Sequence, residues 1–194
     1  MSSSRKKVIL DLDQTLISAE ATEEYDSIKN RKKAKKFSST NMESFYVVFE
    51  RPGLQEFLDF LFKEFDVSIW TAASKDYALF VIEHIIIAGK PNRTLEWIFF
   101  SYHCDISKKY KGHTKDLTVI TDVYKIPGYS LDNTFIIDDY DEVYNTQKEN
   151  CVIAPAFEFE DDNSDKDKFL VELKTALKKY KKAGDINRSL KTLP

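Results

Sequence analysis

Two pairs of aspartates, Asp11 with Asp13 and Asp138 with Asp139, each follow a short apolar run directly. The two-residue spacing of the first pair directs both carboxylates to one side of an extended chain, roughly 6–7 Å apart. Carboxylates that meet at one edge of a fold raise each other's pKa, and a divalent cation relieves that repulsion. A site built from oxygen ligands suits Mg²⁺. Single aspartates are mostly turn formers or helix caps, but two pairs after two apolar runs favour a metal-dependent site.

Short strands that alternate with helices would position these carboxylates. Apolar runs rich in β-branched and aromatic residues predict strands at 8–12, 45–49, 67–71, 97–100, 134–137 and 152–154. The spacing of apolar side chains predicts helices over 54–65, from Ser74 as N-cap to Gly89, and over about 165–182. This alternation predicts an α/β fold with an open, mostly parallel sheet and helices on both faces.

The carboxyl ends of the strands in such a sheet share one edge, and active sites lie there. Thr71 ends a predicted strand, so we expect its hydroxyl beside the aspartate pairs. Two polar segments, 17–44 and 102–112, are predicted to be loops. The first, with the strand after it, would form a small flap over about 17–50.

The basic run from Arg31 to Lys36 lies inside this flap. Such a run could dock an acidic phosphopeptide, serve as a nuclear localisation signal or form a solvated surface. The sequence leaves these three interpretations open.

Composition limits the class of protein. The 194 residues fit a single domain over 1–194, and the net charge of −3 argues against direct nucleic-acid binding. The only cysteines are Cys104 and Cys151, so a cysteine-rich zinc site is not expected and a reducing compartment fits. We find no apolar stretch long enough for a signal peptide or a membrane span. We therefore expect a soluble intracellular protein, nuclear or cytoplasmic.

Several motifs occur together in one order. They are Asp11-x-Asp13-x-Thr15, Arg51-Pro-Gly53, Trp70-Thr-Ala-Ala-Ser74, Lys115-Asp-Leu117 and Ile137-Asp-Asp-Tyr-Asp-Glu-Val-Tyr144. This series resembles the FCP/SCP-type phosphatases of the haloacid dehalogenase (HAD) superfamily, which dephosphorylate phosphoserine in the C-terminal tail of RNA polymerase II. The resemblance runs from about 8 to 155 and implies a HAD-like, Rossmann-like sheet with a small flap and no large cap.

The resemblance also implies a role for each matching residue. Asp11 would attack phosphorus and form an aspartyl-phosphate, since a carboxylate needs no general base to act as a nucleophile. Asp13 would protonate the leaving oxygen and then activate water. Thr71, Lys115 and Thr15 would bind the phosphoryl group, with the lysine supplying the largest electrostatic stabilisation.

The metal ligands follow from the same resemblance. Mg²⁺ would be held by Asp11, by the backbone carbonyl of Asp13 and by Asp139, which stands where the family usually carries asparagine. Asp138 would be a further ligand or an anchor for water or Lys115. The substrate groove would include Tyr77 and Ser101, the latter at a position where the small polymerase-tail phosphatases carry an arginine.

We therefore expect a Mg²⁺-dependent phosphoserine or phosphothreonine protein phosphatase that acts on an extended phosphorylated segment, with the RNA polymerase II tail as one candidate. The absence of a large cap favours a macromolecular substrate. A small-molecule HAD phosphatase and a non-catalytic binding module that retains the fold are the alternatives. The sequence does not decide the oligomeric state, and compact relatives in large DNA viruses leave a viral origin open.

Overall fold

The computed structural model describes residues 5–22, 28–43 and 45–192. Its centre is a five-stranded parallel sheet in the order β6-β5-β1-β7-β8. The strands are β1 (Lys7–Leu10), β5 (Asp66–Trp70), β6 (Leu95–Phe99), β7 (Thr134–Asp138) and β8 (Cys151–Ile153). β1 lies in the middle with β5 on one side and β7 on the other, which explains why its apolar run is buried on both faces. The predicted α/β class with a mostly parallel sheet is confirmed.

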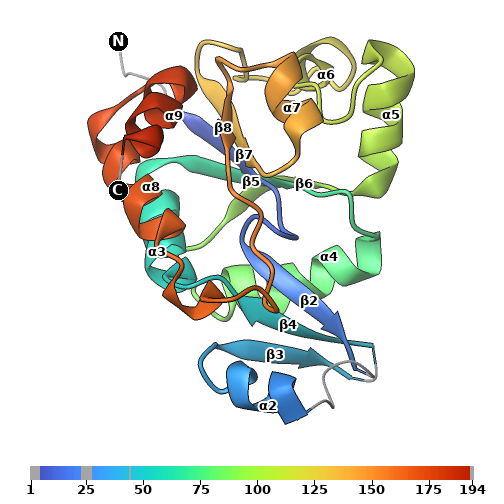
Figure 1. The fold of residues 1–194 in the computed structure, drawn as a ribbon. Coiled ribbons are helices and arrows are strands. Elements are labelled where there is room, and N and C mark those ends of the chain that lie inside the picture. Colours follow the sequence, from blue (N-terminus) through green and yellow to red (C-terminus); the bar gives the residue numbers. More distant parts are fainter. Residues whose placement is uncertain (1–4, 23–27, 44, 193–194) are drawn as a thin grey trace.

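Helices cover both faces of this sheet (Figure 1). One group consists of α3 (Leu54–Glu64), α4 (Lys75–Val81) with its π-helical continuation η1 (Ile82–Ile87), α8 (Phe169–Lys179) and α9 (Ala183–Lys191). The other consists of α5 (Ser101–Lys111), α6 (Thr118–Asp122) and α7 (Asp141–Thr146). A hydrophobic core lies on each face of the sheet, and alternate residues of β1 point into opposite cores. Val8 and Leu10 belong to the cluster that includes α3 and α8, whereas Ile9 belongs to the cluster that includes α6.

The segment predicted as a loop between 17 and 44 is largely ordered structure instead. It holds β2 (Ile17–Ala21), α2 (Ile28–Ala34) and β3 (Ser39–Met42), and the two strands flank β4 (Tyr46–Glu50) in an antiparallel sheet of order β2-β4-β3. The prediction failed because the strands are short and polar. They are held by pairing with β4 and by a small apolar cluster behind it rather than by an apolar run of their own.

Part of the basic run contacts an acidic segment of the same chain. Lys36 Nζ lies 2.8 Å from Asp165 Oδ2, and Lys33 Nζ donates to the backbone carbonyl of Asp161. Both acidic residues precede α8, so the lysines join α2 and the segment after it to the C-terminal part of the chain.

Two further secondary-structure predictions were wrong. The expected loop at 102–112 is helix α5, which the apolar pattern missed because the helix buries mainly Cys104 and Ser107, two small side chains. The C-terminal helix expected over 165–182 is shorter than predicted. The 3₁₀ turn η2 (Ser164–Lys166) precedes α8, which ends at Lys179 because the chain is extended at Tyr180, and α9 begins beyond the predicted range. No helix within the described ranges has both the length and the apolar character needed to cross a membrane.

Candidate active site

The carboxyl ends of three neighbouring strands bring the predicted residues together. Asp11 follows β1 directly and its backbone N–H donates to the carbonyl of Ile137 in β7. Thr71 follows β5, and its N–H donates to the carbonyl of Phe99 at the end of β6. Asp138 is the last residue of β7. The edge that the strand pattern predicts is therefore the edge at which these side chains meet.

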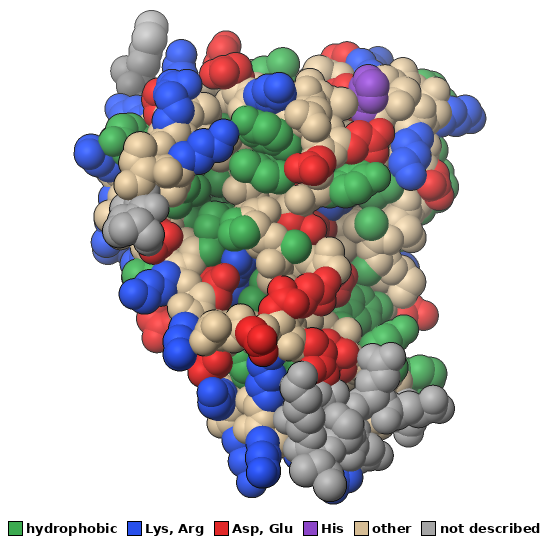
Figure 2. Space-filling model, in the orientation of Figure 1, with side chains coloured by type: hydrophobic (Ala, Val, Ile, Leu, Met, Phe, Trp, Pro, Cys, Tyr) green, Lys and Arg blue, Asp and Glu red, His purple; other side chains and the backbone are tan. Residues whose placement is uncertain are grey.

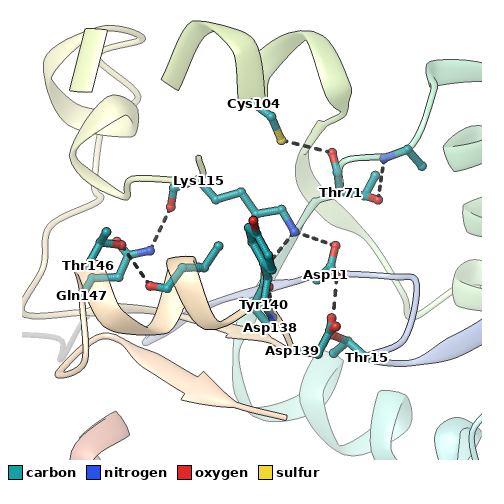
Figure 3. A network of polar contacts seen from close by, with 12 residues as sticks. Asp11, Thr15, Thr71, Cys104, Lys115, Asp138, Asp139, Tyr140, Thr146 and Gln147 are labelled. Carbon is teal, nitrogen blue, oxygen red and sulfur yellow. Dashed lines mark hydrogen bonds and ion pairs between the residues drawn. The ribbon is translucent and has the colours of Figure 1, made fainter. Parts of the chain in front are cut away.

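Lys115 is the cation at the centre of this edge (Figure 3). Its Nζ lies 2.7 Å from Asp11 Oδ1 and 2.7 Å from Asp138 Oδ2. All three side chains are almost completely buried. Charge-assisted hydrogen bonds of this length are strong when water is excluded, so the lysine fixes the orientation of both carboxylates.

Burial dominates the electrostatics of the carboxylates. Because the site is desolvated, the pKa of Asp11 rises to about 6 and the pKa of Asp138 also rises to about 6, even though Lys115 opposes both shifts. For the Lys115 ammonium, burial alone would lower the pKa, but the two adjacent carboxylates outweigh it and raise the pKa above its ordinary value. The lysine therefore remains charged near neutral pH.

Three carboxylates gather closely enough to share a cation. Oxygens of Asp11, Asp138 and Asp139 lie within 4.8 Å of one another. The donor set is entirely oxygen, and its negative charge exceeds what one ammonium neutralises, so it fits a divalent metal ion. The Asp13 carboxylate is outside this cluster, which leaves only its backbone carbonyl for the role expected of it.

Thr15 lies behind the cluster. It is fully buried, and its hydroxyl donates to Asp139 Oδ1 at 2.8 Å, with Asp11 Oδ2 at 3.4 Å. The threonine of the Asp-x-Asp-x-Thr segment thus orients two members of the carboxylate cluster.

Asp13 is held from the other side by helix α4. The Tyr77 hydroxyl donates to Asp13 Oδ1 at 2.6 Å, and Tyr77 is placed by the first turn of α4, which has Ser74 as its N-cap. Burial raises the pKa of Asp13, and the hydrogen bond from Tyr77 opposes that rise. Burial and the adjacent carboxylate raise the pKa of Tyr77, so its hydroxyl remains a donor.

Most of the predicted residues line one hollow of about 400 Å³, partly open to solvent at Asp13, Asp139 and the exposed Lys108. Its lining includes Asp11, Asp13, Thr71, Ser101, Lys115, Asp138 and Asp139. Tyr77 lines an adjoining hollow of about 390 Å³ together with Tyr46, and Asp13 contributes to both. Figure 2 shows acidic side chains gathered near the middle of the face drawn there.

Sequence reasoning missed several residues around this hollow. Cys104, Asp105 and Lys108 line it from α5, and they were overlooked because that segment was predicted to be a loop. Gln147 was also missed: its side chain donates to the backbone carbonyl of Lys115 and accepts from the backbone N–H of Leu117, and no local pattern marks it. The spacing of Ser101, Asp105 and Lys108 is that of one face of a helix. This spacing was the pattern that could have indicated the α5 residues.

A parallel α/β sheet that carries an Asp-x-Asp-x-Thr segment after its central strand, with a lysine and a second aspartate pair at the same edge, defines a protein of the HAD superfamily. Within that superfamily, the chain belongs to the family described as NLI interacting factor-like phosphatase, whose model matches residues 6–187.

Two similar proteins come from viruses of invertebrates. The CTD phosphatase-like protein 355R of Invertebrate iridescent virus 3 is 44% identical over 186 residues, which cover 91% of this chain and 97% of that protein. The protein of the same name in Invertebrate iridescent virus 6 is 41% identical over 179 residues, which cover 90% and 98%.

Among solved structures, the fission yeast RNA polymerase II CTD phosphatase Fcp1 matches with a TM-score of 0.55 at 20% identity. The match covers 79% of this chain but only 42% of that one, so it supports the fold.

Proposed function

We propose that the protein is a Mg²⁺-dependent phosphatase that removes phosphate from phosphoserine or phosphothreonine through an aspartyl-phosphate on Asp11. The observation that carries the proposal is the arrangement around Asp11 at the end of the central strand. Its carboxylate is bonded to Lys115 and clusters with Asp138 and Asp139, at the floor of a hollow that reaches solvent.

In the first step, a carboxylate oxygen of Asp11 forms a bond to phosphorus while the bond between phosphorus and the serine oxygen breaks. Asp13 gives its proton to the departing oxygen, and burial favours the protonated form that this step needs. Lys115 stabilises the charge on the phosphoryl oxygens, and Thr71, which lines the same hollow, donates its hydroxyl to one of them.

In the second step, water attacks the phosphorus of the aspartyl-phosphate, and the Asp13 carboxylate takes a proton from that water. The bond between phosphorus and Asp11 breaks, inorganic phosphate leaves, and Asp13 is again protonated. One residue can serve as acid and then as base because the first step leaves it deprotonated.

Asp11, Asp138, Asp139 and the backbone carbonyl of Asp13 would hold Mg²⁺, since the first three present a compact set of oxygens. When bound, the ion supplies positive charge that screens the nucleophile from the anionic phosphate. Thr15 keeps the Asp139 carboxylate oriented for this role.

We further propose that the substrate is a phosphorylated protein segment. The two adjoining hollows share Asp13, so residues next to the phosphorylated one would lie against Tyr46 and Tyr77. The viral relatives are named CTD phosphatase-like, and the fission yeast protein is an RNA polymerase II CTD phosphatase. A phosphoserine of the polymerase tail is accordingly the first substrate to test.

The decisive experiment compares phosphate release from polymerase-tail peptides, phosphorylated at serine 2 or serine 5 of the repeat, with release from sugar phosphates at saturating Mg²⁺. We expect turnover of at least one phosphopeptide and little of the sugar phosphates. Preferential turnover of sugar phosphates would indicate a small-molecule phosphatase. Asp11→Asn should abolish hydrolysis, and undiminished turnover by that variant would refute the nucleophile.

A further inference from the structure

The backbone of Lys115 has an unusual conformation for a residue with a side chain. Its φ is 51°, in the left-handed region that residues other than glycine rarely occupy. Such a conformation is strained and persists only when the surrounding structure enforces it. Since Lys115 is buried and bonded to two carboxylates, this backbone determines where the ammonium lies.

Gln147 holds the loop on one side of this strained residue. Its Nε2 donates to the carbonyl oxygen of Lys115 at 2.9 Å (Figure 3), and its Oε1 accepts from the backbone N–H of Leu117 at 3.1 Å. The nitrogen and the oxygen of the Gln147 amide thus both form hydrogen bonds to the same short loop. Gln147 follows α7, the helix that begins just after Asp138 and Asp139.

Ser107 of helix α5 holds the same loop from another direction. Its hydroxyl donates to the carbonyl of His113 at 2.6 Å and accepts from the N–H of Asp116 at 2.9 Å. The serine is fully buried. One side chain from α5 and one from the residue that follows α7 therefore fix four backbone groups between 113 and 117, on both sides of Lys115.

We propose that Gln147, with Ser107, is a positioning residue for Lys115, and that it holds the left-handed backbone that places the ammonium between Asp11 and Asp138. Its effect on catalysis rests on the function proposed above, whereas its effect on the lysine does not. Gln147 lies outside the lining of the catalytic hollow, so it acts through the loop.

The first test observes the lysine directly. In metal-free protein labelled with ¹⁵N-lysine, the Lys115 ammonium should give a signal protected from exchange, assigned by its loss in Lys115→Met. We expect Gln147→Leu to shift or broaden this signal. Thr146→Val is the matched control, because the adjacent Thr146 hydroxyl bonds only to carbonyls inside α7.

The second test measures kinetics with the same variants. A lysine moved away from the phosphoryl site should lower kcat on the order of 10-fold to 100-fold, with little change in KM. In the Lys115→Met background, Gln147→Leu should then have no further effect, since the group that it positions is gone. Thr146→Val should retain wild-type kcat.

These tests separate the positioning role from the proposed activity. If wild-type protein released no phosphate, the lysine signal alone would decide the inference. An unchanged Lys115 signal in Gln147→Leu overturns it, as does an equal loss of kcat in Thr146→Val. Should Gln147→Leu fail to fold, Ser107→Ala replaces it in both measurements, with the same expected shift and the same contradicting result.

Discussion

The Tyr77 hydroxyl donates to Asp13 Oδ1 at 2.6 Å, which joins the first turn of α4 to the proposed general acid after β1. The bond stabilises the ionised form of Asp13 and opposes the effect of burial on its pKa. A single phenol therefore fixes the position of the acid and lowers its proton affinity.

Tyr77→Phe tests this relationship. Without the hydrogen bond, the pKa of Asp13 should rise, so the alkaline limb of the pH profile for kcat should move to higher pH on a phosphoserine peptide. Hydrolysis of p-nitrophenyl phosphate should change less, because its leaving group needs little protonation. Tyr46→Phe is the control, since its ring contacts Tyr77 edge-on at 5.6 Å between centroids. An unmoved alkaline limb in Tyr77→Phe would exclude this role.

Metal binding should depend on pH in a defined window. In metal-free protein the pKa of both Asp11 and Asp138 is about 6, above the ordinary value of 3.8, because both are buried. The unfolded chain loses these protons first, so the metal-free fold loses stability as the pH rises from about 4 to 6. Mg²⁺ should therefore raise Tm more at pH 7.5 than at pH 5, as thermal unfolding with and without the ion would show. An equal rise at both values would contradict the carboxylate site.

Asp139→Asn tests how much the negative charge of the Asp139 carboxylate contributes to Mg²⁺ affinity. The variant keeps one oxygen for the ion but removes a charge from the cluster, so we expect Mg²⁺ affinity to fall about 10-fold, or about 1.4 kcal/mol. Asp141→Asn is the matched control, because that exposed carboxylate is outside the cluster. Titration calorimetry would measure both, and equal affinities in the two variants would remove Asp139 from the ligand set.

Arg51 should be important for stability although it does not line the catalytic hollow. Its guanidinium is completely buried and forms a bidentate ion pair with Asp167. It also donates to the backbone carbonyls of Thr15 and Pro155. Removing the guanidinium leaves the Asp167 carboxylate and the two carbonyls without their hydrogen-bond donor. Arg51→Met should therefore lower the free energy of unfolding by about 3 kcal/mol.

Urea denaturation measures this loss, and Arg188→Met supplies the exposed comparison. Arg188 pairs with Asp185 on the surface of α9, where an ion pair contributes little. A similar small effect for both variants would show that the buried network is not stabilising.

The sequence predicts the edge of the sheet that carries the aspartates well, because that edge depends on short-range patterns. Apolar runs mark β1 and β7, and the side chain that follows each run must lie at the sheet's carboxyl edge. The meeting of Asp11, Asp138 and Asp139 follows from that rule alone. Lys115 was identified through the family resemblance, since a lysine in a polar loop carries no periodic signal.

The remainder depends on contacts between distant residues. Gln147 contacts the Lys115 loop only because α5, α6 and α7 share one face of the sheet, which no local window reveals. Helix α5 was missed because it buries small polar side chains, and the antiparallel sheet was missed because β2 and β3 are stabilised by pairing rather than by apolar content.

The position of β1 also has a consequence for biosynthesis. The ribosome makes this strand before its two neighbours in the sheet, which are residues 66–70 and 134–138. Asp11 is therefore synthesised long before Lys115, Asp138 and Asp139. More than a hundred further residues must be added before these partners are present. A nascent chain that ends before β7 has Asp11, the proposed nucleophile, but lacks Asp138 and Asp139, so the proposed site is assembled only after residue 139 has been made.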